Sequence, residues 1–384
     1  MMVRGDWLSA PALRRVLAVL TDAGHRALIV GGAVRNDLLG APISDIDLAT
    51  DARPDRVAAL MKAAGLRVIP TGIDHGTLTV IAAGQPFEIT TFRRDVATDG
   101  RRATVAFADD PAEDAQRRDF TMNALYATPD GRVIDPTGGL ADLAARRLRF
   151  VGDAATRIAE DYLRILRLYR FWAQYGDPDP ATHATALAAV RAQAEGLARI
   201  SRERIGAEMR KLLAAPDPLP MLEDMAAAGV LAIALPGAQI TDLAALIAQE
   251  RATNTPPTAL RRLAALGGDD PTAALRLSRA EGAHLSALAA PLDLPGPQGI
   301  GALAYRHGAA TATDAVLIAA ARAGAPPPPD WRDRIAIGTA AVFPLRAADL
   351  PHLSGPALGA RLKQAEARWI ASGFAASRDD LRDG

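Results

Sequence analysis

Residues 28–48 read LIVGGAVRNDLLGAPISDIDL, and this stretch decides the fold of the N-terminal part of the chain. Its opening apolar run is typical of a buried strand, and Gly31 and Gly32 allow a tight turn into a short helix over 33–39. A turn of this kind leaves free N–H groups at a helix start, which form a natural anion site. Arg35 adds a positive charge beside them.

Two acids, Asp45 and Asp47, follow in a segment whose alternation predicts a strand. Side chains at i and i+2 of a strand point to one face, with Cα atoms roughly 6.5 Å apart. Two such carboxylates can share divalent cations, and a two-metal site activates an attacking hydroxyl and neutralises a leaving pyrophosphate. Magnesium suits oxygen ligands combined with substrate phosphates. Each motif alone is common in ordinary turns, so support must come from elsewhere in the chain.

The composition is that of a soluble globular protein of two or three domains, with 384 residues, 49% apolar and 23% charged. The absence of cysteine excludes disulfides, thiolate zinc sites and thiol nucleophiles. A net charge of zero gives no global argument for a nucleic-acid partner. Because there is neither a signal-peptide pattern nor a long uncharged apolar run, we expect a cytoplasmic protein that does not span a membrane.

The first part of the chain predicts a small α/β layer with mixed strands. Helical spacing and turn residues predict helices over 8–23 and 54–64, and strands over 66–69, 77–82 and 87–93.

Glu88 lies in the last of these strands, where it can reach the metal pair as a third carboxylate or face solvent. The polar stretch 93–114 follows and predicts a mobile loop beside the site, with Asp99-Gly100 as a turn. The alternative is a loop that extends into solvent without a role at the site.

A helix is predicted over 112–127, from which Arg118 can contact triphosphate or ribose hydroxyls. The glycine-containing turn over 133–143 suggests a hinge between domains.

A second chemical segment, 160–170, has helical period. Asp161 and Arg164 are i, i+3 neighbours, and Arg167 and Arg170 wind progressively away from them. One interpretation is a surface ion pair worth well under about 1 kcal/mol. The other is nucleotide recognition: cytosine and adenine present an amino donor beside a ring-nitrogen acceptor, which matches an acceptor-only Asp next to a donor-only Arg. Guanine and uracil present the opposite pattern.

From residue 181 onward the chain is helical by pattern. It includes an amphipathic helix over 200–213, with Ser201 as N-cap, and a helix pair over 350–374. Proline-rich breaks fall at 216–220, 256–257, 291–297 and 325–329.

With these motifs in place, residues 28–213 resemble the class II tRNA nucleotidyltransferase and bacterial poly(A) polymerase family. The matching motifs, in the family's order, are Gly31-Gly32-Ala-Val-Arg35 with Asp45-x-Asp47, Arg117-Arg118-Asp119-Phe-Thr-x-Asn123, the segment Asp135 to Asp142, Glu160-Asp161-x-x-Arg164-x-x-Arg167, and Ser201-Arg-Glu-Arg204. One departure is Asn36, where the family usually has Asp; we expect a local change in how the helix is held.

The resemblance implies an α/β head of polymerase-β nucleotidyltransferase type followed by an all-α neck, body and tail. The catalytic head would occupy 1–150, a helical neck that reads the incoming base 151–215, and a body and tail that hold tRNA 216–384. The implied roles are magnesium binding by Asp45 and Asp47, nucleotide binding by Gly32, Arg35 and Arg118, and base pairing by Asp161 and Arg164 with support from Arg167 and Arg170.

The expected activity is template-independent addition of C, C and A to the tRNA 3′ end with CTP, ATP and Mg²⁺. A poly(A) polymerase, or an enzyme restricted to A or to C, would use the same site. The strand over 87–93 has no longer basic insertion of the kind expected for polyadenylation, which favours tRNA. A non-catalytic RNA-binding protein would have no reason to keep paired acids. No obligatory protein partner is evident.

Overall fold

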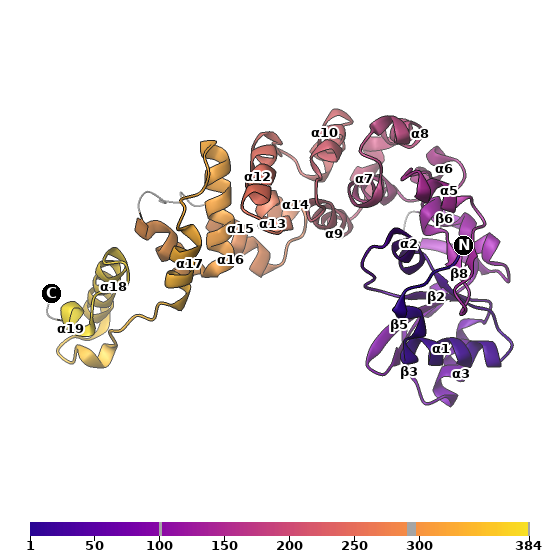
Figure 1. The fold of residues 1–384 in the computed structure, drawn as a ribbon, viewed down its shortest axis with the longest axis horizontal. Coiled ribbons are helices and arrows are strands. Elements are labelled where there is room, and N and C mark those ends of the chain that lie inside the picture. Colours follow the sequence, from indigo (N-terminus) through magenta and orange to yellow (C-terminus); the bar gives the residue numbers. More distant parts are fainter. Residues whose placement is uncertain (100–101, 290–296, 383–384) are drawn as a thin grey trace. The chain divides into compact units, whose positions relative to one another are not determined.

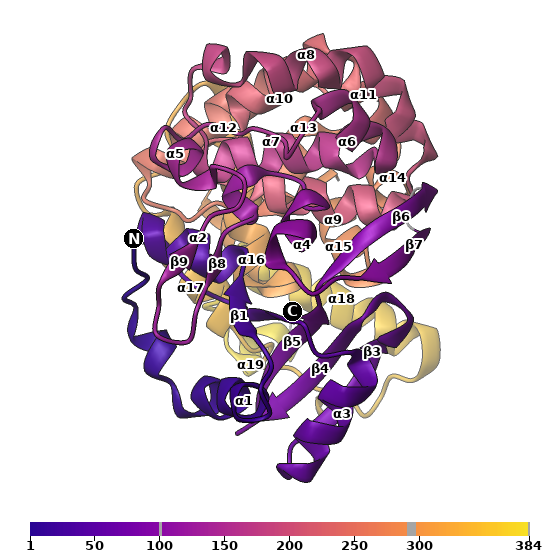
Figure 2. The same cartoon turned by 90° about the vertical axis from the view of Figure 1, so that its right-hand side faces the viewer.

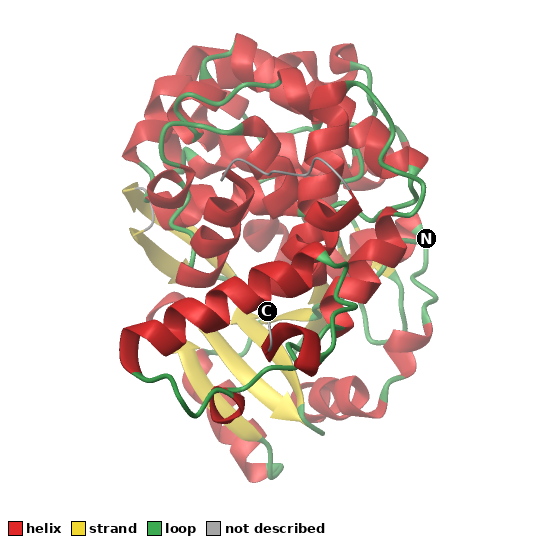
Figure 3. Cartoon of the chain, turned by 90° about the vertical axis from the view of Figure 1, so that its left-hand side faces the viewer, coloured by secondary structure: helices red, strands yellow, loops and turns green. Residues whose placement is uncertain are grey.

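The structure is a computed structural model that describes residues 1–99, 102–289 and 297–382. The chain divides into two compact units, Met1–Ser201 with Ala227–Val230 and Arg202–Ala226 with Leu231–Gly384. The sheets lie in the first unit, and the described part of the second consists of helices and loops (Figures 1 and 3). An α/β portion followed by an all-α remainder is therefore confirmed. The three-domain division stays a prediction.

The main sheet has seven strands in the order β3-β4-β5-β2-β1-β8-β9. The strands are β1 (Ala27–Val30), β2 (Asp47–Thr50), β3 (Arg67–Gly72), β4 (Thr77–Ala82), β5 (Gln85–Thr91), β8 (Tyr126–Ala127) and β9 (Val133–Ile134). Only β2 and β5 pair in parallel among these neighbours. The strands of the α/β layer predicted from the sequence are thus present, and the sheet is mixed as expected (Figure 2).

Helices α1 (Pro11–Asp22) and α3 (Pro54–Ala63) are among those that contact this sheet. The buried residues of α1 recur at helical spacing, which explains why the helix forms where the pattern predicts it; they are Leu13, Val16, Leu17 and Leu20. Along β4 buried and partly exposed residues alternate, as in a strand that faces a core on one side.

The prediction of a loop over 93–114 is wrong. Strands β6 (Arg93–Asp99) and β7 (Arg102–Phe107) pair as an antiparallel hairpin, and α4 (Pro111–Gln116) follows. The valine, threonine and phenylalanine residues of this stretch favour strands, although its many charged residues are more typical of a loop. Gly100, the second residue of the predicted turn, lies outside the described residues.

The helix predicted over 112–127 is also wrong beyond Gln116. The chain continues through a 3-10 turn, Thr121–Asn123, into β8 of the sheet. The Asp119 carboxylate accepts a hydrogen bond from the Phe120 N–H, and Phe120 forms an isolated bridge with Phe150. These local bonds compete with helix formation, because they give the backbone other partners.

The helix predicted over 160–170 is interrupted. Helix α6 (Ala154–Glu160) ends before Asp161, whose backbone is extended, and α7 (Leu163–Tyr175) begins two residues later. The Asp161 carboxylate accepts from the Leu163 N–H at 3.2 Å, so this side chain offers the backbone an alternative to the helix. Several apolar side chains of α7 are buried, among them Leu163, Leu166 and Phe171.

The segment predicted as a hinge is held by hydrogen bonds. Asp135 accepts from the backbone N–H groups of Gly139 and Leu140, at 2.8 and 2.9 Å. Asp142 is buried and pairs with Arg147 and Arg149. These acids anchor α5 (Gly139–Ala144), which precedes α6. Further along the chain, α8 (Ala184–Gln193) follows α7.

The second unit is helical, and none of the described helices is long and apolar enough to cross a membrane. The prediction of a helix pair over 350–374 is wrong, because one helix, α18 (Gly355–Ala371), occupies most of that range. A buried ion cluster joins α12 to α13, where Glu250 pairs with Arg261 and Arg262. The helices are α9 (Arg202–Leu213), α10 (Leu219–Ala227), α11 (Val230–Ala234), α12 (Thr241–Ala252), α13 (Ala259–Leu266), α14 (Pro271–Ala274), α15 (Arg279–Ala289), α16 (Pro297–Ala323), α17 (Trp331–Ala340), α18 (Gly355–Ala371) and α19 (Arg378–Arg382).

Candidate active site

The glycine turn adopts the conformation that its sequence requires. Gly31 follows β1 with φ 72° and ψ −118°, a region that residues with a side chain rarely enter. Its N–H donates to the Leu125 carbonyl at 3.0 Å, which ties the turn to the segment before β8. Helix α2 (Gly32–Leu39) starts at the next residue without a side-chain cap, so its first N–H groups remain available to an anion.

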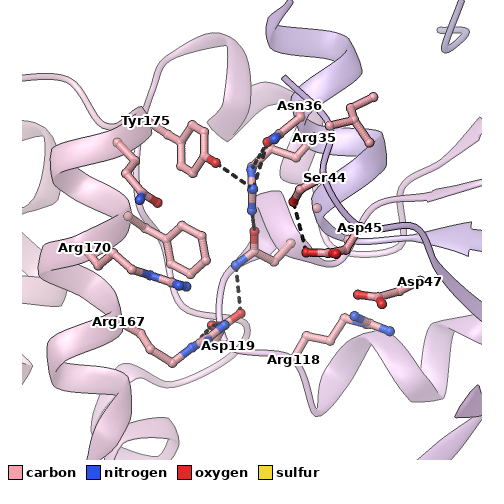
Figure 4. A pocket seen from close by; sticks show the side chains of 16 residues that line it. Arg35, Asn36, Ser44, Asp45, Asp47, Arg118, Asp119, Arg167, Arg170 and Tyr175 are labelled. Carbon is pink, nitrogen blue, oxygen red and sulfur yellow. Dashed lines mark hydrogen bonds and ion pairs between the residues drawn. The ribbon is translucent and has the colours of Figure 1, made fainter. Parts of the chain in front are cut away.

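The turn opens into a pocket of about 300 Å³ within the first unit (Figure 4). Acidic side chains lie on one side of the pocket, and basic and aromatic side chains of α7 lie on the other. The lining residues are Gly31, Gly32, Arg35, Asn36, Ile43, Ser44, Asp45, Asp47, Arg118, Asp119, Asn123, Arg167, Arg170, Phe171, Gln174 and Tyr175.

The acidic side of the pocket is formed by Asp45 and Asp47. Asp47 begins β2, whereas Asp45 precedes the strand, so the prediction that both lie in one strand is wrong. Pro42 falls in the connection between α2 and β2, and it has no backbone N–H to donate to a strand. The parallel register of β2 and β5 places Glu88 beside Asp47, although Glu88 is not among the lining residues.

The carboxylate of Asp47 is perturbed by its surroundings. Burial is the main cause that raises its pKa to about 6, and the negative charges of Glu88 and Asp45 act in the same direction. Arg118 opposes them. Asp47 keeps exposed surface, so solvent screens part of this effect. Within the described residues, no ion pair joins these three acids to a protein cation, and the site concentrates negative charge.

Arg118 is held at the pocket by a buried carboxylate. Its Nη2 donates to Asp114 Oδ2 at 3.0 Å and its Nε to the Tyr126 hydroxyl at 3.1 Å. Tyr126 in turn donates to Asp114 at 2.7 Å. Burial alone would raise the pKa of Asp114, but Arg118 and Arg117 lower it to about 2. Asp114 therefore stays ionised and fixes the direction of the Arg118 guanidinium.

A second fixed pair joins α7 to the segment after α4. Arg167 contacts Asp119 through Nε at 2.6 Å and through Nη2 at 2.5 Å. Burial would raise the pKa of Asp119, but Arg167 and the Asn123 amide lower it to about 2. Arg170, one turn further along α7, is buried and also lines the pocket.

Arg35 lies deepest among these cations, with 6% of its surface exposed. It donates to the Asn36 side chain from Nε and Nη2, at 3.1 and 2.8 Å, to the Asn123 side chain, and to the Tyr175 hydroxyl at 3.0 Å. Burial lowers the pKa of Arg35. The departure from the family pattern thus has a local consequence, because Asn36 accepts from Arg35 as an amide without a charge.

The residues predicted to read the base lie outside the lining set. Arg164 donates to Glu160 at 2.6 Å and to the carbonyls of Arg157 and Arg117. Asp161 accepts from the Leu163 N–H. Arg164 lies next to a pocket element, since Arg117, whose carbonyl it contacts, precedes the lining residue Arg118. Their role in base recognition stays a prediction.

Comparison with known proteins identifies the family. The Poly A polymerase head domain family matches residues 27–149, and the family described as probable RNA and SrmB-binding site of polymerase A matches residues 183–241. The solved structure of the Bacillus stearothermophilus CCA-adding enzyme in complex with CTP is 31% identical, with a TM-score of 0.75 over 94% of this chain and 92% of that one. The chain belongs to the CCA-adding enzyme family.

Curated members of this family are more similar over a shorter region. The human mitochondrial CCA tRNA nucleotidyltransferase 1 is 44% identical over 211 residues, which cover 54% of this chain and 48% of the human protein. The CCA-adding enzyme of Leuconostoc citreum is 46% identical over 200 residues, covering 52% and 48%. The chain thus spans about half the length of the curated relatives it matches.

Several lining residues were missed by sequence reasoning. Asp119 and Asn123 lie inside a motif that was recognised, but nothing local indicated that they contact Arg167 and Arg35. Tyr175 lies beyond the end of the motif on α7. The remaining missed residues are Asn36, Ile43, Ser44, Phe171 and Gln174. Their only sequence signal is that Phe171, Gln174 and Tyr175 continue the helical spacing of the motif arginines.

The acidic side of the pocket fits the divalent cation that this family generally uses. Asp45 and Asp47 provide carboxylate oxygens at the pocket, and no ion pair joins them to a protein cation in the part of the chain that the structure describes, although the charge of Arg118 acts on Asp47. No group of three or more His, Cys, Asp or Glu side chains among the described residues is arranged to hold a metal. This is the donor set of a hard cation that takes one or two carboxylates and completes its shell with water and substrate phosphates.

Proposed function

We propose that this chain adds C, C and A to the 3′ end of tRNA without a nucleic-acid template, using CTP and ATP. The observation that carries the proposal is the single pocket in which the acids at 45 and 47 face the arginines at 118, 167 and 170. A nucleoside triphosphate with its metal needs both signs of charge at one place, because phosphate oxygens bind cations while metals bind carboxylates.

In this proposal each part of the pocket has a separate task. The first N–H groups of α2, after Gly31 and Gly32, bind phosphate oxygens, and Arg35 adds positive charge from behind them. Arg118, fixed by Asp114, stabilises charge on the phosphates or binds the ribose. Magnesium held by Asp45 and Asp47 would activate the 3′-hydroxyl of the RNA for attack and neutralise the leaving pyrophosphate.

Glu88 is proposed as a third acid beside Asp47. The register of β2 and β5 supports this role, because paired residues of neighbouring strands share one face of a sheet. Its exclusion from the lining set argues for an indirect contribution, through its charge on Asp47.

Base selection is assigned to Asp161 and Arg164, with Arg167 and Arg170 in support. An acceptor next to a donor complements the edges of cytosine and adenine and opposes those of guanine and uracil. Since Arg164 now donates to Glu160 and to backbone carbonyls, the proposal requires its side chain to turn toward a bound nucleotide.

The helices after residue 201 are proposed to hold the tRNA, and the cytoplasm is proposed as the place of action. The match of residues 183–241 to an RNA-binding family supports the first of these.

The test is incubation of the 384-residue chain with tRNA that lacks its CCA end and with each labelled nucleotide singly. The proposal predicts incorporation of CMP from CTP, and of AMP only after two C residues are present. Incorporation of ATP alone, with CTP ignored, would instead indicate an A-adding or polyadenylating enzyme. An Asp47→Ala variant that binds tRNA normally but transfers nothing separates catalysis from RNA binding.

A further inference from the structure

One aromatic ring of α7 lies among three arginines of the pocket. The guanidinium carbon of Arg170 is 4.2 Å from the centroid of the Phe171 ring, that of Arg35 is 5.1 Å away, and that of Arg167 is 5.2 Å away. All three distances fall within the range in which a cation is attracted to the face of a ring. Phe171 is 95% buried, so water screens these contacts little.

A second ring of the same helix also holds Arg35. The Arg35 guanidinium carbon is 4.1 Å from the centroid of the Tyr175 ring, and its Nη2 donates to the Tyr175 hydroxyl at 3.0 Å. Phe171 and Tyr175 are i, i+4 neighbours on α7, with ring centroids 5.9 Å apart. The pair therefore links Arg35, on α2 of the head, to the helix that carries Arg167 and Arg170.

The position of Arg35 is fixed by neutral groups. Its hydrogen-bond acceptors are two amides and a phenol, and four of the five guanidinium N–H donors are engaged in these bonds. Among the described residues no ion pair joins Arg35 to a carboxylate, so its charge can act on an anion at the pocket. At the same time, the three cations around this ring repel one another; Asp119 attracts Arg35 and Arg167, and the Phe171 ring lies within reach of all three guanidinium groups.

We propose that Phe171 and Tyr175 are positioning residues for the nucleotide, whose ring faces hold the guanidinium groups of Arg35, Arg167 and Arg170 at one wall of the pocket. The arginines provide the positive charge for the triphosphate, and the two rings set where that charge lies. This inference rests on the proposed function for its ligand, a nucleoside triphosphate, and it adds residues that the sequence motif did not mark.

The test compares Phe171→Leu with a matched control, Phe150→Leu. Phe150 is as buried as Phe171 and also contacts Phe120, but among the described residues no guanidinium lies over its ring. Both variants lose an aromatic ring from the first unit, so a general loss of stability affects both. Only Phe171→Leu removes the ring that the arginines surround.

CTP binding is measured by titration of the full chain without RNA, and KM and kcat are measured with tRNA lacking its CCA end. Phe171→Leu is expected to weaken CTP binding and raise KM about tenfold with kcat nearly unchanged, whereas Phe150→Leu stays within about twofold. Equal effects in the two variants would overturn the inference.

Tyr175 provides a second series. Tyr175→Phe keeps the ring and loses the hydroxyl, and is expected to raise KM about threefold, whereas Tyr175→Leu loses both and approaches the Phe171→Leu value. Identical KM values for wild type and Tyr175→Leu would contradict the proposal. If the wild type binds CTP but transfers none, the proposed function fails while the binding comparison still decides the inference; if it binds no CTP, both fail.

Discussion

Replacement of Asp47 by asparagine is expected to stabilise the ligand-free protein while it removes metal-dependent transfer. The substitution keeps the shape of the side chain and removes one of the charges that Glu88 and Asp45 oppose. A site that concentrates acids for a cation pays a stability cost when the cation is absent, and Asp47 is where burial and like charges act together.

The size of the expected gain in unfolding free energy follows from the pKa of Asp47, which rises from 3.8 to about 6 on folding. At about 1.4 kcal/mol per pKa unit this gives an upper bound of about 3 kcal/mol. Because Asp47 keeps exposed surface, solvent screens the interaction, and about 1 kcal/mol is the expected gain. For a unit of this size, 1 kcal/mol corresponds to roughly 2–4 °C in Tm.

The sign of the pH dependence follows from the same shift. A carboxyl whose pKa is raised by folding favours the folded state when protonated, and this contribution is lost as the pH rises from 3.8 to about 6. The stability advantage of Asp47→Asn is therefore largest above pH 6 and shrinks as the pH falls toward 4.

The assay is thermal unfolding of the metal-free chain at pH 7.5 and pH 5, with Asp22→Asn as a control for the loss of one exposed charge, expected to stay within about 0.5 kcal/mol. Adding Mg²⁺ with CTP should raise Tm in the wild type more than in Asp47→Asn. Glu88→Gln should also stabilise, and less than additively with Asp47→Asn. A metal-free Asp47→Asn protein that is less stable than wild type at pH 7.5 would refute the reasoning.

Three further outcomes are expected. Asp114→Asn should lower kcat/KM about tenfold or more and the free energy of unfolding by about 1–3 kcal/mol, because Arg118 loses its buried ionised partner. Steady-state kinetics and urea unfolding measure these two effects, and unchanged kinetics would contradict the prediction. Arg262→Met should lower the unfolding free energy of the second unit by about 3–5 kcal/mol in denaturant titrations, since Glu250 loses one of its paired cations, and a neutral result would show that the pair is dispensable. Burial lowers the pKa of His183 below 6.5, so the stability that its neutral ring contributes is complete above about pH 6.5 and is lost as the pH falls. The drop in Tm between pH 7.5 and 5.5 should therefore be smaller in His183→Gln than in the wild type. An equal drop in both proteins would show that His183 does not cause this pH dependence.

The parts of the site that the sequence predicted are those encoded by neighbouring residues. The glycine turn, the start of α2 and the acids at 45 and 47 lie within one short stretch, where backbone preference and spacing determine the local structure. Arg118 and Arg167 were found for a similar reason, since each belongs to a charged motif. These predictions needed no knowledge of which segments meet.

The parts that could not be predicted depend on contacts between distant segments. Arg35 meets Asn123 and Tyr175, which are 88 and 140 residues away along the chain. No periodicity indicates such a meeting. The hairpin β6–β7 was missed for another reason: its strands contain many charged residues and pair with each other, and no apolar alternation marks them.

The break at Asp161 had a visible signal that was given too little weight. An aspartate inside a helical pattern can bond the backbone two residues on, and its carboxylate does so at the Leu163 N–H. The helical period of the flanking residues hid this. A consequence is that Asp161 precedes α7, which carries Arg164, although the Arg164 N–H still donates to the Asp161 carbonyl at 3.0 Å.

The central claim is that acids and arginines meeting in one pocket transfer nucleotides to tRNA. Its most direct measurement is the length and sequence of the 3′ end of a tRNA lacking CCA after incubation with the chain, CTP, ATP and Mg²⁺, beside a variant carrying both Asp45→Asn and Asp47→Asn. We expect the wild type to extend the RNA by C, C and A and then stop, and the variant to leave it unchanged. An unextended RNA with the wild type, or the same extension with the variant, would contradict it.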